Sequence, residues 1–545
     1  MKFDHICRMK LLLTALITCV LYLPATNSWG KDGTVIQVDT LKAVSEKNRV
    51  PPTKPLDIGH LKYAHGVQVT GNSELVYAIP EGFKRFEAWV GRDMTTPKAR
   101  LRFRVFTDDT LAFDSGWCVY RGSSQNPNVN AQRAMRVSVP LAGCKQLRLV
   151  TEGVGNADWA EAVLVQEGYP LWQTPPPSPE DALAPTPPMG WNAWNSLGSK
   201  ITAESYKQIV DTVVSIGMKD AGYLYITLDD LHGKEKKTFP KGLKASADYA
   251  HSKGLKFGMY GQGELRLNQG VPNAAKLAAI GVDFFKYDYS TKRQNIQLIE
   301  DIKKTGRPIV VSTCEWGLDK PWEWAPGIGS QMWRESFDLL DRWEAKWAMN
   351  ASNSEIHHNR GIGIINSIDL MEAMGRYTRP GQWNDPDCLV VGLHGKSQTS
   401  GHIANSGCTC EEYRTQFSLY CMLATPLFAS NDLRDMDEFC RETLVNKEAI
   451  AVNQDPLGVP GWRCRKLDEK EVWIKPLKGG DLAVALFNRG KEATKIEVRW
   501  IDLDIAGKYK VRDLWAHSDL GKFNSKLDLD VKSHEVRLLR LSPAK

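Results

Sequence analysis

Met189-Gly-Trp-Asn-Ala-Trp194 begins a series of eight short apolar segments, each ending in polar or aromatic residues, between residue 186 and about residue 435. Later members of the series are Tyr225-Ile-Thr-Leu-Asp-Asp230, Lys256-Phe-Gly-Met-Tyr260, Phe284-Phe-Lys-Tyr-Asp288, Ile309-Val-Val-Ser-Thr-Cys-Glu-Trp316, Trp333-Arg-Glu-Ser-Phe-Asp338 and Gln382-Trp-Asn-Asp-Pro-Asp387. Strands that are buried on both faces of a parallel sheet read as continuous apolar runs of this kind. The series predicts a (β/α)8 barrel, in which functional groups lie where the strands end.

Helical patterns separate these segments and support the barrel. Residues 203–221 carry apolar side chains at helical spacing, and Gly222 ends the pattern. Residues 245–253 and 273–280 repeat the arrangement, and each is followed by a glycine, the residue that most often caps a helix C-terminus. A strand, a helix, a glycine and the next strand recur at roughly 30 residues, which is the length of a βαβ unit.

A chain of 545 residues is too long for one hydrophobic core, and two all-β regions flank the predicted barrel. Residues 33–170 contain short alternating runs between polar turns, which predicts a β-sandwich. Residues 171–185 are rich in proline and predict an extended, semi-rigid linker. The barrel is assigned to residues 186–458. Residues 460–545 show strand patterns without helices, which predicts a small antiparallel β-sandwich domain.

Residues 1–28 have the pattern of a signal peptide. Lys2, Arg8 and Lys10 precede an apolar run at residues 11–23, which is too short to cross a bilayer comfortably. Small residues suited to cleavage follow, and no later segment has the pattern of a transmembrane helix. The sequence therefore predicts an exported protein, located in the periplasm, at the cell surface or in the medium.

Composition restricts the partners and cofactors. The net charge of +6 comes from interspersed charges of both signs, without the basic block that would indicate nucleic acid binding. Two of the eleven cysteines lie in the predicted signal peptide, which leaves nine. One or two disulfide bonds are expected, for example among Cys408, Cys410, Cys421 and Cys440. The spacing of Cys408 and Cys410 is not that of a zinc site, and no metal or other cofactor is predicted.

The side chains at the ends of the barrel segments suit a sugar. They are mainly aspartates and tryptophans, with one glutamate, one lysine and one arginine. Carboxylates accept hydrogen bonds from sugar hydroxyls, and tryptophan faces pack on pyranose rings. A barrel that binds phosphorylated metabolites is disfavoured, because no glycine-rich phosphate loop is present and because export is predicted.

The barrel segments resemble glycoside hydrolase family 27, the family of α-galactosidases and α-N-acetylgalactosaminidases. The resemblance runs from Thr186-Pro-Pro-Met-Gly-Trp-Asn-Ala-Trp-Asn195 to Asn453-Gln-Asp-Pro-Leu-Gly458, and Val511-Arg-Asp-Leu-Trp515 extends it to the C-terminal domain. The first β region is similar to the NPCBM type of carbohydrate-binding module in Phe86-Glu-Ala-Trp-Val-Gly91 and Asp158-Trp-Ala-Glu-Ala162. The resemblance implies a retaining α-galactosidase that cleaves terminal α-D-galactosyl residues from oligo- or polysaccharides.

By this resemblance, Asp288 is the nucleophile and Asp338 is the acid/base. In a retaining glycosidase, one carboxyl group attacks the anomeric carbon and the other protonates the leaving oxygen. Lys286 lies two residues before Asp288 and shares its face of the strand, so its ammonium should favour the ionised nucleophile. The charge of Asp288 should raise the pKa of Asp338. From the residues alone, a buried structural ion pair is an equally good interpretation of Lys286 and Asp288.

The resemblance also assigns four residues that would bind sugar hydroxyls. Asp229 and Asp230 would bind the 4- and 6-hydroxyls. Lys286 would bind the 3- and 4-hydroxyls, and Arg334 the 2- or 3-hydroxyl. A metal site at the paired aspartates is disfavoured, because His232 is a lone histidine and no third ligand is evident.

Other residues are expected to shape the pocket. Trp194 would form an apolar wall, Tyr260 would line the pocket, and Asp387 would lie beside the acid/base in a loop braced by Trp383 and Asp385. In this family, a glutamate at the position of Glu315 accepts a hydrogen bond from the 2-hydroxyl, whereas N-acetylgalactosaminidases carry a small residue there. Glu315 therefore favours galactose, because a buried hydroxyl partner discriminates strongly between substrates.

The chain departs from the family pattern at the pocket rim. Most members have cysteine and tryptophan where this chain has Leu231 and His232, and a cysteine where it has Ser290. The partner cysteine after the third strand is absent from the segment that begins at Gln262, and Cys388 replaces a methionine. The disulfide bond that lines the family's pocket is therefore missing.

These departures leave two alternatives. One is β-L-arabinopyranosidase activity, since L-arabinopyranose resembles galactose without its C6 group, and the region of Asp229, His232 and Trp194 would decide. The other is a glycan-binding protein on an inactive barrel, which the presence of both Asp288 and Asp338 disfavours.

Overall fold

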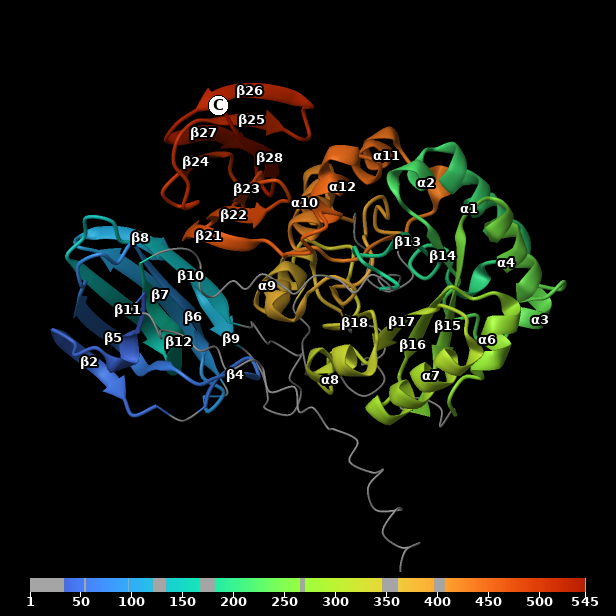
Figure 1. Ribbon diagram of the computed structural model, residues 1–545, viewed down its shortest axis with the longest axis horizontal. Coiled ribbons are helices and arrows are strands. Elements are labelled where there is room, and N and C mark those ends of the chain that lie inside the picture. Colours follow the sequence, from blue (N-terminus) through green and yellow to red (C-terminus); the bar gives the residue numbers. More distant parts are fainter. Residues whose placement is uncertain are drawn as a thin grey trace, which may run out of the picture.

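The computed structural model describes residues 34–52, 55–96, 98–120, 134–166, 182–264, 270–345, 361–396 and 407–544. Figure 1 shows an N-terminal β domain in blue, a barrel running from green to orange, and a C-terminal β domain in red. The predicted signal peptide and most of the predicted linker lie outside the described residues. Among the helices that are described, none is long and apolar enough to cross a membrane.

The barrel consists of parallel strands in the order β19-β18-β17-β16-β15-β14-β13-β20. The strands are β13 (Met189–Asn192), β14 (Tyr225–Thr227), β15 (Lys256–Gln262), β16 (Phe284–Asp288), β17 (Val310–Cys314), β18 (Met332–Arg334), β19 (Trp383–Asp385) and β20 (Leu427–Ala429). A parallel bridge between Leu389 and Ala429 joins the segment after β19 to β20 and closes the circle. The prediction of a (β/α)8 barrel is confirmed.

Helices cover the outside of the barrel (Figure 1). They are α1 (Ala203–Ser215), α2 (Met218–Ala221), α3 (Glu235–Thr238), α4 (Leu243–Ser252), α6 (Ala274–Ile280), α7 (Lys292–Thr305), α8 (Pro321–Ile328), α9 (Ile364–Met374), α10 (Cys410–Met422), α11 (Glu438–Leu444) and α12 (Lys447–Asn453). Thr202 and Thr291 begin α1 and α7 with capping boxes, in which side chains satisfy the first backbone N–H groups. The prediction of a single helix over residues 203–221 is wrong. The left-handed Gly217 (φ 85°) separates α1 from α2, a conformation that glycine adopts at little cost.

The N-terminal domain is an antiparallel β fold around one apolar core. Its main strands are β1 (Val35–Gln37), β2 (Ser45–Val50), β5 (Gly66–Ala78), β6 (Arg85–Arg92), β7 (Ala99–Thr107), β8 (Thr110–Asp114), β9 (Cys118–Tyr120), β10 (Met135–Pro140), β11 (Gln146–Val154) and β12 (Asn156–Val165). Trp159 is fully buried and packs edge-on against Phe103 with ring centroids 5.5 Å apart. The alternating pattern that predicted this domain corresponds to β7, whose buried residues alternate with more exposed ones.

The N-terminal domain packs directly on the barrel. The hairpin of β3 (Leu56–Ile58) and β4 (Leu61–Tyr63) shares a buried apolar cluster with Trp322 and Trp324 of α8 and with Trp333 of β18. The guanidinium of Arg376 lies 4.7 Å from the centroid of the Tyr63 ring. The buried apolar cluster holds the two domains together.

The C-terminal domain is an antiparallel β fold, as predicted. Its strands are β21 (Trp462–Leu467), β22 (Lys470–Pro476), β23 (Leu482–Asn488), β24 (Thr494–Arg499), β25 (Tyr509–Asp513), β26 (Ser518–Phe523), β27 (Lys526–Val531) and β28 (Val536–Pro543). Arg463 in β21 is buried and forms ion pairs with Glu372 of α9 (2.9 Å) and with Glu471 of β22 (3.0 Å). These buried charges satisfy one another and join the domain to the barrel.

All nine cysteines of the described residues are free. The expected disulfide bonds among Cys408, Cys410, Cys421 and Cys440 are therefore not found there. Cys421 is buried within α10, while Cys410 at the start of the same helix is exposed. Sequence spacing did not reveal that these thiols point into different environments.

Candidate active site

The barrel strands bring the ten predicted site residues to one end of the barrel. Asp288 and Arg334 are the last residues of β16 and β18, and Lys286 and Tyr260 lie within β16 and β15. The others follow a strand closely: Trp194 after β13, Asp229 and Asp230 after β14, Glu315 after β17, Asp338 after β18, and Asp387 after β19. The C-terminal ends of parallel barrel strands form one mouth, so the predicted constellation comes from seven neighbouring strands.

Lys286 interacts with two carboxylates at this mouth, those of Asp229 and Asp288. Its Nζ lies 3.1 Å from Oδ2 of Asp229, and Nδ2 of Asn192 donates to the same oxygen at 2.9 Å. Burial lowers the pKa of Lys286, but the charges of Asp229 and Asp288 outweigh this effect and raise the pKa well above its usual value. Lys286 therefore remains a cation, which pairs with Asp229 and interacts electrostatically with Asp288.

Asp288 is buried and remains largely ionised at neutral pH. Burial raises its pKa to about 6, while the Lys286 ammonium and a hydrogen bond from the Cys314 thiol oppose the rise. The backbone N–H of Tyr289 donates to Oδ1 at 3.0 Å. The expectation that Lys286 favours the carboxylate is correct in direction, but burial has the larger effect.

Arg334 connects a second pair of carboxylates. Its Nη2 lies 3.3 Å from Oδ1 of Asp338 and 3.0 Å from Oδ2 of Asp387. The guanidinium is buried, whereas 37% of the Asp338 side chain is exposed. Asp338 can therefore reach a substrate while Arg334 holds it from behind.

The pKa of Asp338 is raised above its usual value. Burial raises it most, the charge of Arg334 opposes the rise, and the charge of Asp387 adds to it. The neighbouring carboxylate with the largest effect is therefore Asp387, which the sequence interpretation did not name as a cause. The charge of Asp338 does raise the pKa of Asp288, so the two predicted catalytic groups interact electrostatically.

Asp387 is held in an unusual conformation. Its φ of 84° is rarely adopted by residues with side chains. The backbone N–H of Leu339 donates to Oδ2 at 2.8 Å, and that of Cys388 donates to Oδ1 at 2.7 Å. Asp385 accepts a hydrogen bond from the backbone N–H of Asp387 at 2.8 Å. Together these contacts fix the loop that faces the acid/base.

The rim beside Asp230 contains the main departures from the family pattern. Nε2 of Gln262 donates to Oδ2 of Asp230 at 2.7 Å and to the hydroxyl of Tyr260 at 3.0 Å. His232 donates its backbone N–H to Oδ1 of Asp230 at 2.8 Å. Its ring stacks on Trp194, with centroids 5.9 Å apart and planes 11° apart. A polar and aromatic cluster thus surrounds Asp230 at the rim, where the sequence predicted that no disulfide bond is present.

Glu315 lies beside the pocket rather than open to it. The side chain is 1% exposed, and Oε2 accepts the backbone N–H of Asp319 at 2.7 Å. Burial raises its pKa to about 8, so the carboxyl group is mostly protonated at neutral pH. Its Oε1 is buried without a hydrogen-bond partner among the described residues.

Cys314 is a site residue that the sequence interpretation missed. It is paired in register with Asp288 across β16 and β17, and its thiol hydrogen-bonds to that carboxylate. Nη1 of Arg334 lies 3.9 Å from its sulfur. The last residues of adjacent barrel strands lie side by side, and this alignment was the signal that could have found Cys314.

A (β/α)8 barrel with two interacting carboxyl groups, one buried and one partly exposed, at its C-terminal mouth is typical of glycosidases. The chain matches three family models: Alpha galactosidase A over residues 186–455, Alpha galactosidase C-terminal beta sandwich domain over 468–541, and NPCBM/NEW2 domain over 26–165. The chain belongs to the alpha-galactosidase A family.

Three similar proteins illustrate the relationship. Alpha-galactosidase A from Cellvibrio japonicus is 35% identical over 403 residues, which cover 67% of this chain and 93% of that protein. The structure of alpha-galactosidase I from Mortierella vinacea is 29% identical, covers 67% of this chain and 99% of its own, and has a TM-score of 0.59. A β-L-arabinopyranosidase from Geobacillus stearothermophilus, in complex with arabinose, is 23% identical, covers 67% and 98%, and has a TM-score of 0.56. This last likeness concerns the fold alone.

Proposed function

We propose that the protein is a retaining α-galactosidase that removes terminal α-D-galactosyl residues from oligo- or polysaccharides. The observation that carries this proposal is the environment of the two carboxyl groups. Asp288 is buried and interacts electrostatically with Lys286, and Asp338 is partly exposed beside Arg334. This chain covers 93% and 91% of two relatives named alpha-galactosidase. This coverage supports the same substrate class.

The chemistry follows from these environments. The ionised Asp288 attacks the anomeric carbon of the galactoside and forms a galactosyl ester, while Asp338 gives its proton to the departing oxygen. Asp338, now a carboxylate, takes a proton from water, and the water oxygen attacks the anomeric carbon and releases Asp288. Arg334 pairs with both Asp338 and Asp387, so it helps to position the acid/base. The anomeric configuration is retained after the two displacements.

The proposal gives each pocket residue a role. Asp229 pairs with Lys286, so both belong to the side of the sugar that carries the 3- and 4-hydroxyls. Asp230 points instead to Gln262 and His232, and we assign it to the 6-hydroxyl. Trp194 and Tyr260 form the adjoining walls. Arg334 and Glu315 lie toward the 2-hydroxyl.

One observation favours the alternative of β-L-arabinopyranosidase activity. His232 stacks on Trp194 beside Asp230, on the side that this proposal assigns to the C6 group of galactose. Initial rates on the p-nitrophenyl α-D-galactoside and β-L-arabinopyranoside test the choice. We expect the galactoside to be the faster substrate. A faster arabinoside would retain the mechanism and change the substrate.

Replacing Asp230 tests its assignment to the 6-hydroxyl. Asp230→Ala should lower kcat/KM for the galactoside by about 10–100-fold more than for the arabinoside, which has no 6-hydroxyl. A hydrogen bond to a charged group contributes about 1.5–3 kcal/mol, and each 1.4 kcal/mol or so changes a rate tenfold. Asp248→Ala, on the exposed face of α4, is the control. Equal losses on both substrates would contradict the assignment.

The acid side of the pH profile should report Asp288. Its raised pKa of about 6 means that acidification protonates the nucleophile. The value of kcat/KM should therefore fall as pH decreases through about 6, by about tenfold per pH unit below it, because only the carboxylate attacks. Steady-state rates between pH 4 and 8, approximately, check this. A constant kcat/KM down to about pH 4 would contradict the buried environment of Asp288.

We also propose that the protein is exported. The charged residues Lys2, Arg8 and Lys10 and the apolar run at residues 11–23 support this proposal. Expression of the full chain in a bacterium with a secretion system, followed by N-terminal sequencing of the product outside the cytoplasm, tests it. We expect a mature chain that begins near residue 29. Product that stays in the cytoplasm with Met1 intact would contradict export.

A further inference from the structure

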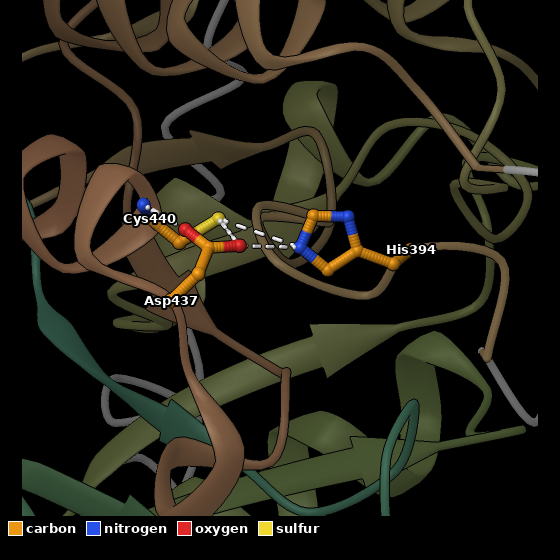
Figure 2. Close-up of side chains that lie close together, drawn as sticks. All are labelled: His394, Asp437 and Cys440. Atoms are coloured by element: carbon orange, nitrogen blue, oxygen red, sulfur yellow. Dashed lines mark hydrogen bonds and ion pairs between the residues drawn. The ribbon is translucent and has the colours of Figure 1, made fainter.

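Three side chains with different donor atoms converge at the edge of the barrel mouth. His394 lies in the loop after β19, Asp437 immediately precedes α11, and Cys440 lies in the first turn of that helix. Figure 2 shows the imidazole of His394 pointing at the carboxylate and the thiol, which lie next to each other. The donor atoms of all three residues lie within 4.8 Å of one another.

The distances are close to those between ligands of a tetrahedral ion. Sγ of Cys440 lies 3.4 Å from Oδ2 of Asp437 and 3.8 Å from Nε2 of His394. The distance between Oδ2 of Asp437 and Nε2 of His394 is 2.8 Å. Zinc bonds of about 2.0–2.3 Å in a tetrahedral arrangement place neighbouring ligands about 3.3–3.6 Å apart. Only the nitrogen–oxygen pair has to separate, by about half an ångström, for an ion to enter.

The surroundings hold the three ligands in place. Oδ1 of Asp437 accepts the backbone N–H of Cys440 at 2.7 Å, which leaves Oδ2 for the cluster. The hydroxyl of Tyr413 accepts the backbone N–H of His394 at 2.8 Å, and it donates to the buried Asp341. Asp341 in turn accepts the backbone N–H of Gly395 at 2.7 Å. These hydrogen bonds hold the backbone of His394 and Gly395 against Tyr413 and Asp341.

The three side chains of the cluster differ in their exposure to solvent. The Cys440 side chain is buried, whereas those of His394 and Asp437 are 38% and 46% exposed. One side of the cluster therefore faces solvent, and a water molecule can complete four ligands. Cys410, at the start of α10, lies close enough to Asp437 and Cys440 to interact with them electrostatically, but it is not one of the three converging ligands.

We propose that His394, Asp437 and Cys440 bind a divalent transition-metal ion of the zinc type. A nitrogen, a carboxylate oxygen and a sulfur suit zinc better than the oxygen-seeking calcium or magnesium. On binding, the Cys440 thiol releases its proton to solvent and coordinates as a thiolate. Without the ion, the thiol donates its hydrogen bond to Asp437, so the cluster has a stable hydrogen-bonded form as well.

The site would fix the loop after β19 to α11. His394 and Asp437 are 43 residues apart in the sequence, so an ion between them would bridge two distant segments. The loop after β19 also contains Asp387, which contacts Arg334 beside the acid/base. The ion is structural in this proposal, because its ligands do not include any residue assigned to the chemistry.

Cobalt(II) binding to the full chain tests the proposal. The reduced protein is freed of metal with a chelator and titrated with Co²⁺, a coloured substitute for zinc, and zinc content is measured separately by elemental analysis. We expect one ion per chain and the intense absorption of a thiolate–cobalt bond. His394→Gln should weaken binding at least about 100-fold, since even indirect partners of a metal site contribute 10–100-fold. Cys440→Ser should remove the thiolate absorption.

Two matched variants are the controls. Cys464→Ser replaces another buried cysteine, in β21, and His251→Gln replaces another histidine paired with an aspartate, Asp283 at 2.7 Å. Both should bind Co²⁺ like the wild type. If Cys440→Ser does not fold, the half-exposed His394→Gln variant decides.

Three results would overturn the proposal. The first is the absence of thiolate absorption in the reduced wild type. The second is binding that is equal in the wild type and in His394→Gln. The third is a disulfide bond between Cys410 and Cys440 in the purified protein, detected by mass spectrometry of thiol-labelled peptides, because that bond would use the sulfur ligand.

Discussion

Asp288→Ala lowers kcat on an aryl α-galactoside by at least about 10⁴-fold, and sodium azide restores part of the rate. Removing a catalytic nucleophile costs on the order of 10⁴–10⁶ in kcat. The cavity left by the carboxylate gives azide access to the face of the sugar opposite the leaving group. The product should therefore be β-galactosyl azide, formed by one displacement with inversion. Product configuration by NMR and initial rates with and without azide are the measurements.

The configuration of the azide product makes this experiment specific for the nucleophile. An α-galactosyl azide from Asp288→Ala would show that the covalent intermediate still forms, and would place the nucleophile elsewhere. Asp248→Ala is a control, since its side chain is exposed and pairs with Lys244 on the surface of α4. Its rate should stay within about threefold of the wild type. An unchanged melting temperature of Asp288→Ala separates lost chemistry from lost folding.

Asp338→Ala should produce a different pattern. Proton donation by a positioned acid contributes about 10²–10⁴-fold, and the loss should be largest for a galactosyl disaccharide, whose leaving group needs a proton. A p-nitrophenyl galactoside needs little protonation, so its first step should remain fast and the galactosyl-enzyme should accumulate. Azide needs no general base and should attack this intermediate. The expected product is α-galactosyl azide.

A burst of p-nitrophenol followed by a slow steady state would reveal the accumulated intermediate. Equal losses on the disaccharide and the aryl galactoside would contradict the role of Asp338 as proton donor. Asp341→Ala is not a suitable control, because Asp341 holds the loop at Gly395. Asp435→Ala is suitable, since 86% of its side chain is exposed and its one ion pair, to Lys396, is on the surface.

The sequence predicted the barrel and the strand-end residues well, because both depend on local patterns. Continuous apolar runs mark buried parallel strands, and the residue that ends such a run lies at the barrel mouth. This is why Asp288 and Arg334 were placed correctly. The break at Gly217 was missed, since helical spacing continues across it and only the left-handed backbone interrupts the helix.

Other features depend on contacts between distant segments. The charge of Asp387 raises the pKa of Asp338. Asp387 follows the next barrel strand, β19, and sequence spacing does not reveal this interaction. The sequence interpretation did not connect Cys440 with His394, because the cluster joins the loop after β19 to the start of α11. The expected disulfide bonds failed for the same reason: counting cysteines does not show which sulfur atoms face each other.

The packing of β3 and β4 against α8 determines how the protein would meet a polymer. A flexible tether lets a binding module search the volume within its reach, and the gain in local concentration depends on tether length. Here the N-terminal domain is attached through a buried apolar contact, so its surface and the barrel mouth keep one spacing and one relative angle. A glycan bound by both the N-terminal domain and the barrel mouth would have to match that spacing. The enzyme would then select polysaccharides by the interval between side branches as well as by the sugar at their ends.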